Sequence, residues 1–293
     1  MKIAVLGYSN TNNIGDNIQT LAVAQHIGQE CSIVDRDFLS HYAGEPCVVV
    51  MNGWFSHEPQ NWPPSENIIP IFFGFHLSEK ARETYSRHSE YLKRFEPIGC
   101  RDRDTVETLT KWGVDAYISG CATMTFPERP RSLKGRTDVL VDIRTWYFDR
   151  KERKQFRQIS HKHDVPFATH ATKNQLAKDL LTYYRTNARA AITSRIHCAI
   201  PCFALGIPAV YSGIIDYRTE IIADIGIPTT KFSRMRKTSR SSIQFGIPDF
   251  NDKKTDIAND LRGKLTAHGI CLAPWSAQDT NEDQEFLSNL KWA

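Results

Sequence analysis

Short apolar runs alternate with longer stretches of helical periodicity along the whole chain, which predicts strands separated by helices. The first run, residues 2–8, leads into a polar loop and then into a helix that ends near residue 28. Further elements of this half are predicted as strands at 31–35, 47–51, 68–73, 97–100 and 116–118 and as helices at 78–95 and 104–112. This alternation predicts a parallel sheet with helices on both faces.

The pattern restarts after residues 125–131, whose prolines and charges predict a linker. The second half is predicted to contain strands at 138–143, 165–168, 190–192, 209–211 and 229–232 and helices at 149–161, 174–184, 198–205, 219–225, 254–268 and 280–292. We therefore expect an α/β protein of two Rossmann-like domains, residues 1–126 and 127–293, with the last helix packed back across the first domain.

Composition narrows the class of protein. Hydrophobic residues make up 41% of the chain and charged residues 24%, which are ordinary values for a folded globular protein. No apolar run reaches the roughly 20 residues that a membrane span needs, and the first strand begins at once, so we expect a cytoplasmic protein. The seven cysteines are scattered without a Cys-x-x-Cys pair, which favours reduced structural thiols and predicts no metal site.

Charge differs between the two halves. Residues 1–126 hold 10 Lys and Arg against 15 Asp and Glu, a net charge of −5, and residues 127–293 hold 27 against 18, a net charge of +9. An acidic half facing a basic half suits a cleft that binds an anionic donor, although lipid phosphates or nucleic acid would suit a basic surface equally well. Because no nucleic-acid-binding module is recognisable, we expect no nucleic acid partner.

The stretch from Ala191 to Gly213 carries the clearest chemical signal. A buried strand ends near Ile192, and Ser194, Arg195 and His197 follow at the turn into an apolar helix. Ligands of parallel α/β sheets bind beyond the carboxyl ends of the strands, where a helix N-terminus presents free N–H groups to an anion. An arginine and a histidine at this corner are suited to hold and protonate an anionic substrate.

Three segments in chain order carry a family signature. They are Asn13-Ile14-Gly15-Asp16-Asn17 after the first strand, Arg101-Asp102-Arg103-Asp104-Thr105 with the helix that follows it to Gly113-Val114, and Ser194-Arg195-Ile196-His197 with Leu205-Gly206-Ile207-Pro208. Together they span most of the chain and resemble the polysaccharide pyruvyl transferase family. The resemblance implies a GT-B-like arrangement, in which two Rossmann-like domains face each other across a cleft.

The resemblance also implies a reaction, the transfer of pyruvate from phosphoenolpyruvate onto two hydroxyls of a sugar in cell-surface polysaccharide biosynthesis. A cyclic ketal forms and phosphate leaves. Such a reaction needs an acid for the donor's methylene carbon, cations for its carboxylate and phosphate, and a base for the attacking hydroxyl. It needs no cofactor, and the Gly-x-Gly-x-x-Gly pattern of dinucleotide-binding proteins is absent after the first strand.

Candidate residues for the donor lie mainly in the second half. His197 is the candidate acid, because imidazole titrates near neutral pH, and Arg195 and Arg144 are the candidate donor clamp. Each of these side chains has a structural alternative, namely a helix-opening histidine bound to a carbonyl or a surface ion pair. The remaining predicted donor-side residues are Ser194, the backbone N–H of Ile196, Ser212 and His170.

Candidate residues for the acceptor lie in the first half. The amides of Asn12, Asn17 and Asn52 suit sugar hydroxyls, and the indole of Trp54 suits the apolar face of a sugar ring. Asp16 is a candidate base, although an aspartate at a helix start is often only a cap. For Arg101 and Asp102 we favour an internal ion pair that holds their helix.

A basic run from Lys231 to Arg240 holds five cationic residues in ten. It predicts either a solvated loop or contact with an anionic membrane surface or a lipid-diphosphate-linked sugar acceptor. Two other functions remain open from the sequence. They are a GT-B glycosyltransferase with a nucleotide-sugar donor and a carbohydrate-binding protein without catalysis, although Arg195 and His197 in one turn argue against the latter.

Overall fold

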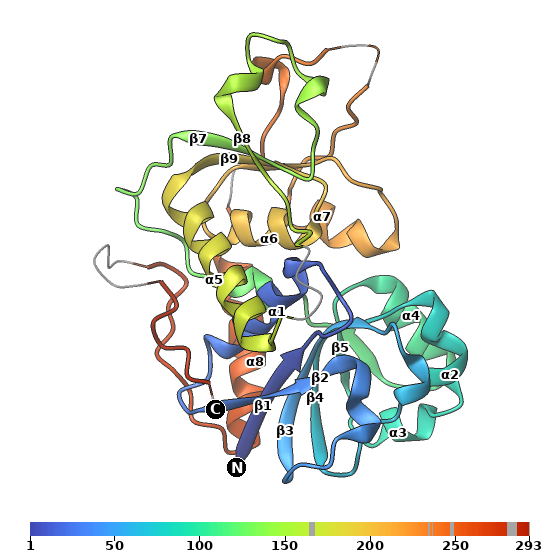
Figure 1. The fold of residues 1–293 in the computed structure, drawn as a ribbon. Coiled ribbons are helices and arrows are strands. Elements are labelled where there is room, and N and C mark those ends of the chain that lie inside the picture. The colour runs from blue at the N-terminus through green and yellow to red at the C-terminus, as the bar shows by residue number, and fades with distance from the viewer. Residues whose placement is uncertain (164–167, 234, 236, 247–248, 280–285, 293) are drawn as a thin grey trace.

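Two parallel sheets form the framework of the computed structural model, which describes residues 1–163, 168–233, 235, 237–246, 249–279 and 286–292. The first sheet contains β1 (Lys2–Gly7), β2 (Cys31–Asp35), β3 (Cys47–Phe55), β4 (Ile68–Leu77), β5 (Ile98–Cys100) and β6 (Ala116–Ile118). The second contains β7 (Thr137–Val141), β8 (Phe156–Ile159), β9 (Ala188–Thr193) and β10 (Ala209–Tyr211). The two sheets lie at opposite ends of the molecule with helices between them (Figure 1).

Both sheets have the same strand order. The first runs β2-β1-β3-β4-β5-β6 and the second β10-β9-β7-β8. In each sheet, the second strand along the chain (β2 or β8) is an edge strand beside the first (β1 or β7). The later strands follow on the other side of the first strand. All strand pairs are parallel. This is the doubly wound Rossmann-like order, and the prediction of an α/β protein with two such units is confirmed.

The first sheet is buried on both faces, which explains the continuous apolar sequence of its central strands. In β3, the side chains of Val48 and Val50 enter one hydrophobic core, and that of Val49 enters another. The second of these cores contains an aromatic cluster around Trp62 and Phe75. Alternation of side chains along each strand therefore fills two layers at once.

The helices of the first half differ in regularity. They are α1 (Ile14–Ala24), α2 (Arg82–Ser86), α3 (Ser89–Lys93) and α4 (Arg103–Lys111). The prediction of one helix over residues 78–95 is wrong, because a 3₁₀ turn at Glu79–Ala81, α2 and α3 replace it. Ser78 precedes this turn but its side chain caps no N–H group.

The second half contains α5 (His170–Asn187), α6 (Ile196–Ala204), α7 (Glu220–Asp224) and α8 (Asn251–Ala267). The prediction of a helix over residues 149–161 is wrong, because Phe156–Ile159 forms the edge strand β8 beside β7. The rings of Phe148 and Phe156 lie 4.5 Å apart in a small core under this sheet, and Arg157 and Gln158 are exposed between buried Phe156 and half-buried Ile159. Burial of two phenylalanines decides the local structure against the charged sequence.

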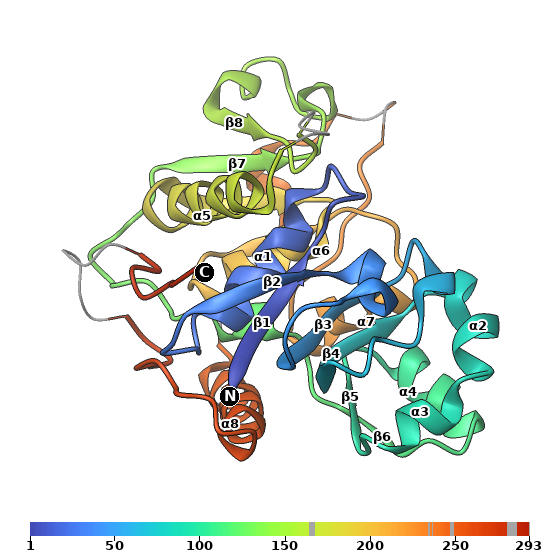
Figure 2. The same cartoon turned by 60° about the horizontal axis from the view of Figure 1, so that its bottom comes forward.

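One hydrophobic core joins the two halves of the molecule. It extends from β1 and β3 through α1 to α5 and α6, and α1 lies between the first sheet and these helices in both views (Figures 1 and 2). Lys173 of α5 is buried and donates from Nζ to the carbonyl oxygens of Tyr8, Ser9 and Thr11 at 3.0–3.1 Å. The loop after β1 is thus held by a side chain of the second half.

The C-terminal part of the chain returns to the first sheet. The predicted amphipathic helix at 254–268 is confirmed as α8, whose Asp260 accepts a hydrogen bond of 2.5 Å from Tyr117. Trp292 forms a bridge with Cys31 of β2. Residues 286–289 form a turn and residues 290–292 are extended chain with one bridge, in place of the predicted helix, and residues 280–285 lie outside the described part of the chain.

Two other predicted strands fare differently. Most of the strand predicted at 165–168 lies outside the described residues. For residues 229–232 the structure shows a single bridge, between Thr229 and Tyr211, in place of a strand. In the described part of the chain, every helix is too short or too polar to span a lipid bilayer.

Candidate active site

A pocket of about 730 Å³ lies where the carboxyl ends of both sheets meet. In each sheet the strand order reverses at the first strand, and doubly wound proteins bind ligands at such switch points. The first half lines the pocket with the loop after β1, the end of β3 and the turn after β5. The second half lines it with the β9–α6 turn and the segment that follows β10.

The N-terminus of α6 faces this pocket through Ser194, Arg195, Ile196 and His197. The N–H groups of Cys198 and Ala199 are bound within the helix, whereas no hydrogen bond is found for those of Ile196 and His197 among the described residues. Arg195 is the N-cap residue and its side chain caps no N–H group. Because the first N–H groups of a helix carry partial positive charge, this end is suited to an anion.

Arg195 is held in place by an aspartate of the neighbouring strand. Its Nε donates to Asp142 Oδ2 at 2.5 Å, and the same carboxylate accepts bonds from Ser160 Oγ at 2.7 Å and the His161 N–H at 3.3 Å. These three donors outweigh burial and lower the pKa of Asp142. The Nε atom of Arg195 is thus fixed, and its Nη groups have no hydrogen-bond partner among the described residues, which leaves them for a ligand.

His197 opens α6 and is buried to 9% exposure. Its Nε2 lies 3.4 Å from Nη1 of Arg101, and because a guanidinium only donates, the imidazole accepts through Nε2. Burial and the charge of Arg101 hold the pKa of His197 well below its usual range. His197 is therefore a neutral hydrogen-bond acceptor.

The close approach of α1 to His197 depends on a glycine. A Cβ atom at Gly15 would lie 3.2 Å from the Cβ of His197 and 3.2 Å from Nδ1 of His161. Any larger residue would push the start of α1 away from α6. Gly15 therefore lets the two helix N-termini converge on one pocket.

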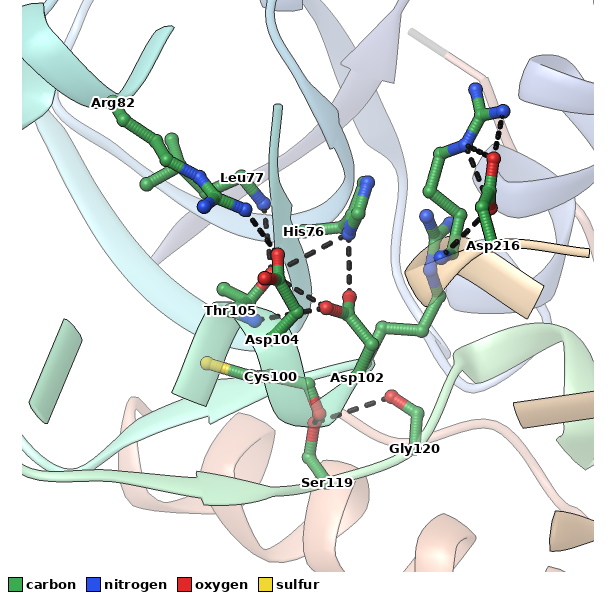
Figure 3. A network of polar contacts seen from close by, with 12 residues as sticks. His76, Leu77, Arg82, Cys100, Asp102, Asp104, Thr105, Ser119, Gly120 and Asp216 are labelled. Carbon is green, nitrogen blue, oxygen red and sulfur yellow. Dashed lines mark hydrogen bonds and ion pairs between the residues drawn. The ribbon is translucent and has the colours of Figure 1, made fainter. Parts of the chain in front are cut away.

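Arg101 and Asp102, neighbours in the chain, point to different partners. Asp102 caps α4 by accepting from the Thr105 N–H at 2.9 Å, and its other oxygen accepts from His76 Nδ1 at 2.5 Å (Figure 3). Burial and the nearby Arg101 lower the pKa of His76 to about 4, so it is neutral and donates through Nδ1. The predicted ion pair between Arg101 and Asp102 is wrong, since Arg101 turns to the pocket and to His197.

Asp16 lies in the first turn of α1 and faces the same pocket. The helix cap is Asn13, whose side chain accepts from the Gly15 N–H at 3.2 Å, so Asp16 is not the cap. Burial raises the pKa of Asp16, and the charges of Arg36, His57 and Arg101 only partly oppose that rise. A carboxylate with a raised pKa is suited to accept a proton.

An aromatic pair lines the first-domain wall, the part of the pocket lining that comes from the first half of the chain. The rings of Trp54 and His57 lie 4.4 Å apart. The guanidinium of Arg36 lies 5.6 Å from the indole and is itself fixed by two hydrogen bonds to Asp37. Trp54 is thus supported from behind by a fixed cation and belongs to the same pocket lining as Asp16.

Arg218 completes the set of arginines in the pocket lining. Its Nε donates to both carboxylate oxygens of Asp216 at 3.0–3.1 Å, and Asp216 also takes part in a capping box with Thr219. Figure 3 shows Asp216 to the right of Asp102 and His76, on the side away from Arg82 and Thr105. The carboxylate of Asp216 therefore holds both Arg218 and the turn at Tyr217–Thr219 in place.

Seven of the predicted site residues line the pocket, and five do not. Those in the pocket are Asp16, Trp54, Ser194, Arg195, Ile196, His197 and Ser212. Arg144 is exposed and lines an adjoining cavity of about 590 Å³, which shares Ser194 and Arg195 with the pocket. The other four residues, Asn12, Asn17, Asn52 and His170, lie outside this lining.

Those four residues have other surroundings. The amide of Asn17 is buried and donates to Asn174 Oδ1 at 2.8 Å, and Asn52 Oδ1 accepts from the Ala122 N–H at 3.3 Å. Asn12 is exposed. His170 lies at the start of α5, where its Nε2 is 3.5 Å from Asp35 Oδ2.

The structure adds pocket residues that the sequence analysis missed. They are Arg101, Arg218, His57 and His161. His161 follows β8 and was hidden by the wrong prediction of a helix there. For Arg218 a signal existed in the capping box formed by Asp216 and Thr219, which marks an ordered turn. Among the described residues, no group of three or more His, Cys, Asp or Glu side chains is arranged to hold a metal ion.

Comparison with known proteins identifies one family. The family model of polysaccharide pyruvyl transferases matches residues 13–214, which include all three segments with the family signature. No curated protein sequence matches the chain.

Solved structures show distant likeness. An uncharacterized protein from Klebsiella pneumoniae is 12% identical, with a TM-score of 0.44 over 75% of this chain and 87% of its own. A UDP-N-acetylglucosamine 2-epimerase is 10% identical, with a TM-score of 0.42 over 94% of this chain and 92% of its own. The glycosyltransferase SnogD from Streptomyces nogalater is 11% identical, with a TM-score of 0.36 over 91% of this chain and 95% of its own.

Proposed function

The chain belongs to the polysaccharide pyruvyl transferase family, and we propose that it transfers pyruvate from phosphoenolpyruvate to a sugar acceptor, forming a cyclic ketal. Family membership supports pyruvyl transfer in polysaccharide biosynthesis. The donor, the ketal product and the roles of individual residues are the proposal.

The proposed donor site lies between the N-terminus of α6 and three arginines. Arg195, Arg101 and Arg218 all line the pocket, and the free N–H groups of Ile196 and His197 lie at its edge. Phosphoenolpyruvate carries a carboxylate and a phosphate, which guanidinium groups bind in two-pronged geometry. This convergence of cations on one helix N-terminus is the observation that carries the proposal.

His197 is the proposed acid for the donor's methylene carbon. In the reaction, one proton moves to that carbon and leaves C2 open to attack by an acceptor hydroxyl. The second hydroxyl then displaces phosphate, which carries away the second hydroxyl proton. Two hydroxyl protons are thus exchanged for one new C–H bond and one protonated phosphate, and no oxidant is needed.

Asp16 is the proposed base for the first attacking hydroxyl. It lines the pocket from the first half of the chain, and Arg195 and His197 line the same pocket from the second half. Its raised pKa favours proton acceptance. The indole of Trp54 lines the pocket as well and offers a flat apolar surface of the kind on which sugar rings stack.

A thermal-shift titration tests the donor assignment. We expect phosphoenolpyruvate to stabilise the protein more than inorganic phosphate does, and Arg195→Ala to abolish the difference. Arg87→Gln is a matched control that also removes one arginine. Arg87 is exposed at the C-terminal end of α2, outside the pocket, where it pairs with Glu83 of the same helix. A response to uridine diphosphate alone would replace the proposal with nucleotide-dependent glycosyl transfer.

We also propose that the basic run contacts an anionic lipid surface that carries the acceptor. Among its described residues, Arg240 is tied to Asp138 at 2.6 Å, and Lys237 donates to the Trp146 carbonyl at 2.6 Å. Lys231 and the almost fully exposed Met235 are free to meet a membrane. Residues 234 and 236 lie outside the described part.

Vesicle sedimentation tests this surface contact. Binding to vesicles with anionic lipid, weaker in a Lys231→Gln/Lys237→Gln variant and absent with neutral lipid, is the expected result. Equal sedimentation of the variant and the wild type would contradict it.

A further inference from the structure

Arg101 and His197 form an unusual contact at the floor of the pocket, between two groups that both carry positive charge when protonated. Nη1 of Arg101 lies 3.4 Å from Nε2 of His197, and both residues are buried, at 4% and 9% exposure. The guanidinium has no carboxylate partner among the residues that the structure describes, and its Nε also lacks a hydrogen-bond acceptor there. A buried, unpaired guanidinium is costly unless a ligand supplies the opposite charge.

This contact fixes the protonation state of the imidazole. Arginine stays charged at any pH near neutrality and can only donate, so Nε2 of His197 accepts and carries no proton. The other titratable neighbours do not reverse this. His76 is held neutral by burial and by the nearby Arg101, and His161 uses its Nε2 on Tyr184 Oη at 3.0 Å. Asp16 and Arg195 line the same pocket.

We propose that Arg101 keeps His197 unprotonated until an anionic donor binds, and that donor binding makes His197 take up one proton from solvent. The inference rests on the proposed function, because it takes phosphoenolpyruvate as the anion. A donor carboxylate or phosphate on Arg101 would neutralise the guanidinium and take its N–H groups. Nε2 is then free to bind a proton and to donate it toward the donor.

The consequence is an acid that exists only in the donor complex. The proton passes from solvent to Nε2 on binding and from Nε2 to the methylene carbon during the reaction, so its balance is complete. An empty enzyme has no charged imidazole to exchange with water. Arg101 thereby acts as a positioning residue for His197 as well as a ligand of the donor.

Proton uptake on binding is measured directly by calorimetry. Phosphoenolpyruvate is titrated in buffers of different ionisation enthalpy at about pH 8, where a phosphate monoester with a second pKa near 6 is already a dianion. We expect the wild type to take up more protons than His197→Gln by a large fraction of one proton per donor bound. Equal uptake in both proteins overturns the inference but leaves donor binding, and with it the proposed function, intact.

Substitution of Arg101 separates its charge from its structural role. Arg101→Lys retains the cation and is expected to preserve the uptake, whereas in donor-free Arg101→Gln the pKa of His197 is expected to rise toward its ordinary value. The imidazole Cε1–H signal of His197 in the empty protein, followed by NMR, should accordingly titrate at higher pH in Arg101→Gln than in the wild type. Unchanged titration there would overturn the inference.

Arg87→Gln serves as the control for surface charge, and its uptake should equal that of the wild type. If Arg101→Gln fails to fold, the wild type, His197→Gln and Arg101→Lys still decide the matter. If the wild type does not bind phosphoenolpyruvate at all, both the proposed donor and this inference fail, which is distinct from binding without uptake.

Discussion

The two walls of the pocket hold their charges in different ways. The second-domain wall is the part of the pocket lining that comes from the second half of the chain. There, Arg195 is bound to Asp142 and Arg218 to Asp216, so each guanidinium has a carboxylate from its own half. On the first-domain wall, neither Arg101 nor Asp16 forms an ion pair with any residue in the described part of the chain.

The difference separates positioning from chemistry. A tethered arginine has a fixed direction, but its partner already offsets part of its charge. An untethered buried charge is unfavourable for folding and changes its behaviour most when a ligand arrives. The second-domain wall is therefore built to orient an anion, and the first-domain wall is built to respond to it.

The largest effect is expected where the two walls meet, at His197. His197→Gln keeps a hydrogen-bonding side chain of similar reach but cannot deliver a proton, so kcat should fall about 10²–10⁴-fold with donor binding retained. Steady-state kinetics and donor calorimetry on the same protein measure the two quantities. Near-normal turnover would remove His197 from the proposed mechanism.

Asp16→Asn tests the carboxylate of the first-domain wall, which accepts a hydrogen bond from Gln19 Nε2 at 3.4 Å but has no ion-pair partner in the described part of the chain. As the base is lost, kcat should fall about 10²-fold, whereas stability at neutral pH should rise by about 1 kcal/mol because a buried unpaired charge is removed. Steady-state kinetics should show the fall in kcat, and chemical denaturation of the same variant should show the rise in its free energy of unfolding. A loss of both would identify Asp16 as a structural residue.

The pH dependence of the wild type follows from the raised pKa of Asp16. The folded protein binds this proton more tightly than the unfolded chain, so the contribution of Asp16 to stability increases as pH falls through the folded pKa toward the unfolded one. Activity moves the other way, since the base must be ionised. Asp16→Asn should remove this rise in stability on acidification.

The sequence predicted the second-domain wall better than the first, for a physical reason. Ser194, Arg195 and His197 follow one another at a strand-to-helix turn, so local pattern alone places them together. Arg101 and Asp102 are also adjacent, but consecutive side chains of extended backbone point in opposite directions. Which of them faces the pocket depends on His76, 26 residues earlier in the chain, which binds Asp102.

The errors in the fold have a similar origin. The charged stretch around Arg153 to Arg157 suggested a helix, yet Phe148 and Phe156 pack together under the second sheet and make Phe156–Ile159 an edge strand. The amides of Asn17 and Asn52 suited sugar hydroxyls but are used inside the protein. Composition indicates what a side chain can bind, whereas long-range packing decides what it meets.

Asp142→Asn tests the tether on the second-domain wall. Asp142 has a φ of 55°, and asparagine tolerates this left-handed backbone, so the variant removes charge without backbone strain. A charge-assisted hydrogen bond contributes about 1.5–3 kcal/mol. We expect KM for phosphoenolpyruvate to rise about tenfold with little change in kcat, because Arg195 loses its fixed direction. A fall in kcat alone would mean that Asp142 takes part in the chemistry.

The smallest effect is expected from Asp216→Asn, the tether of the second paired arginine. Arg218 is 44% exposed against 27% for Arg195, so water competes more strongly for its charge and its ion pair contributes less. Asparagine also caps a helical turn as well as aspartate does, which preserves the start of the Tyr217–Thr219 turn. KM should therefore rise only about twofold. An effect as large as that of Asp142→Asn would mean that the direction of Arg218 matters as much for donor binding as that of Arg195, and the two arginines of the second-domain wall would then be equal ligands of the anion.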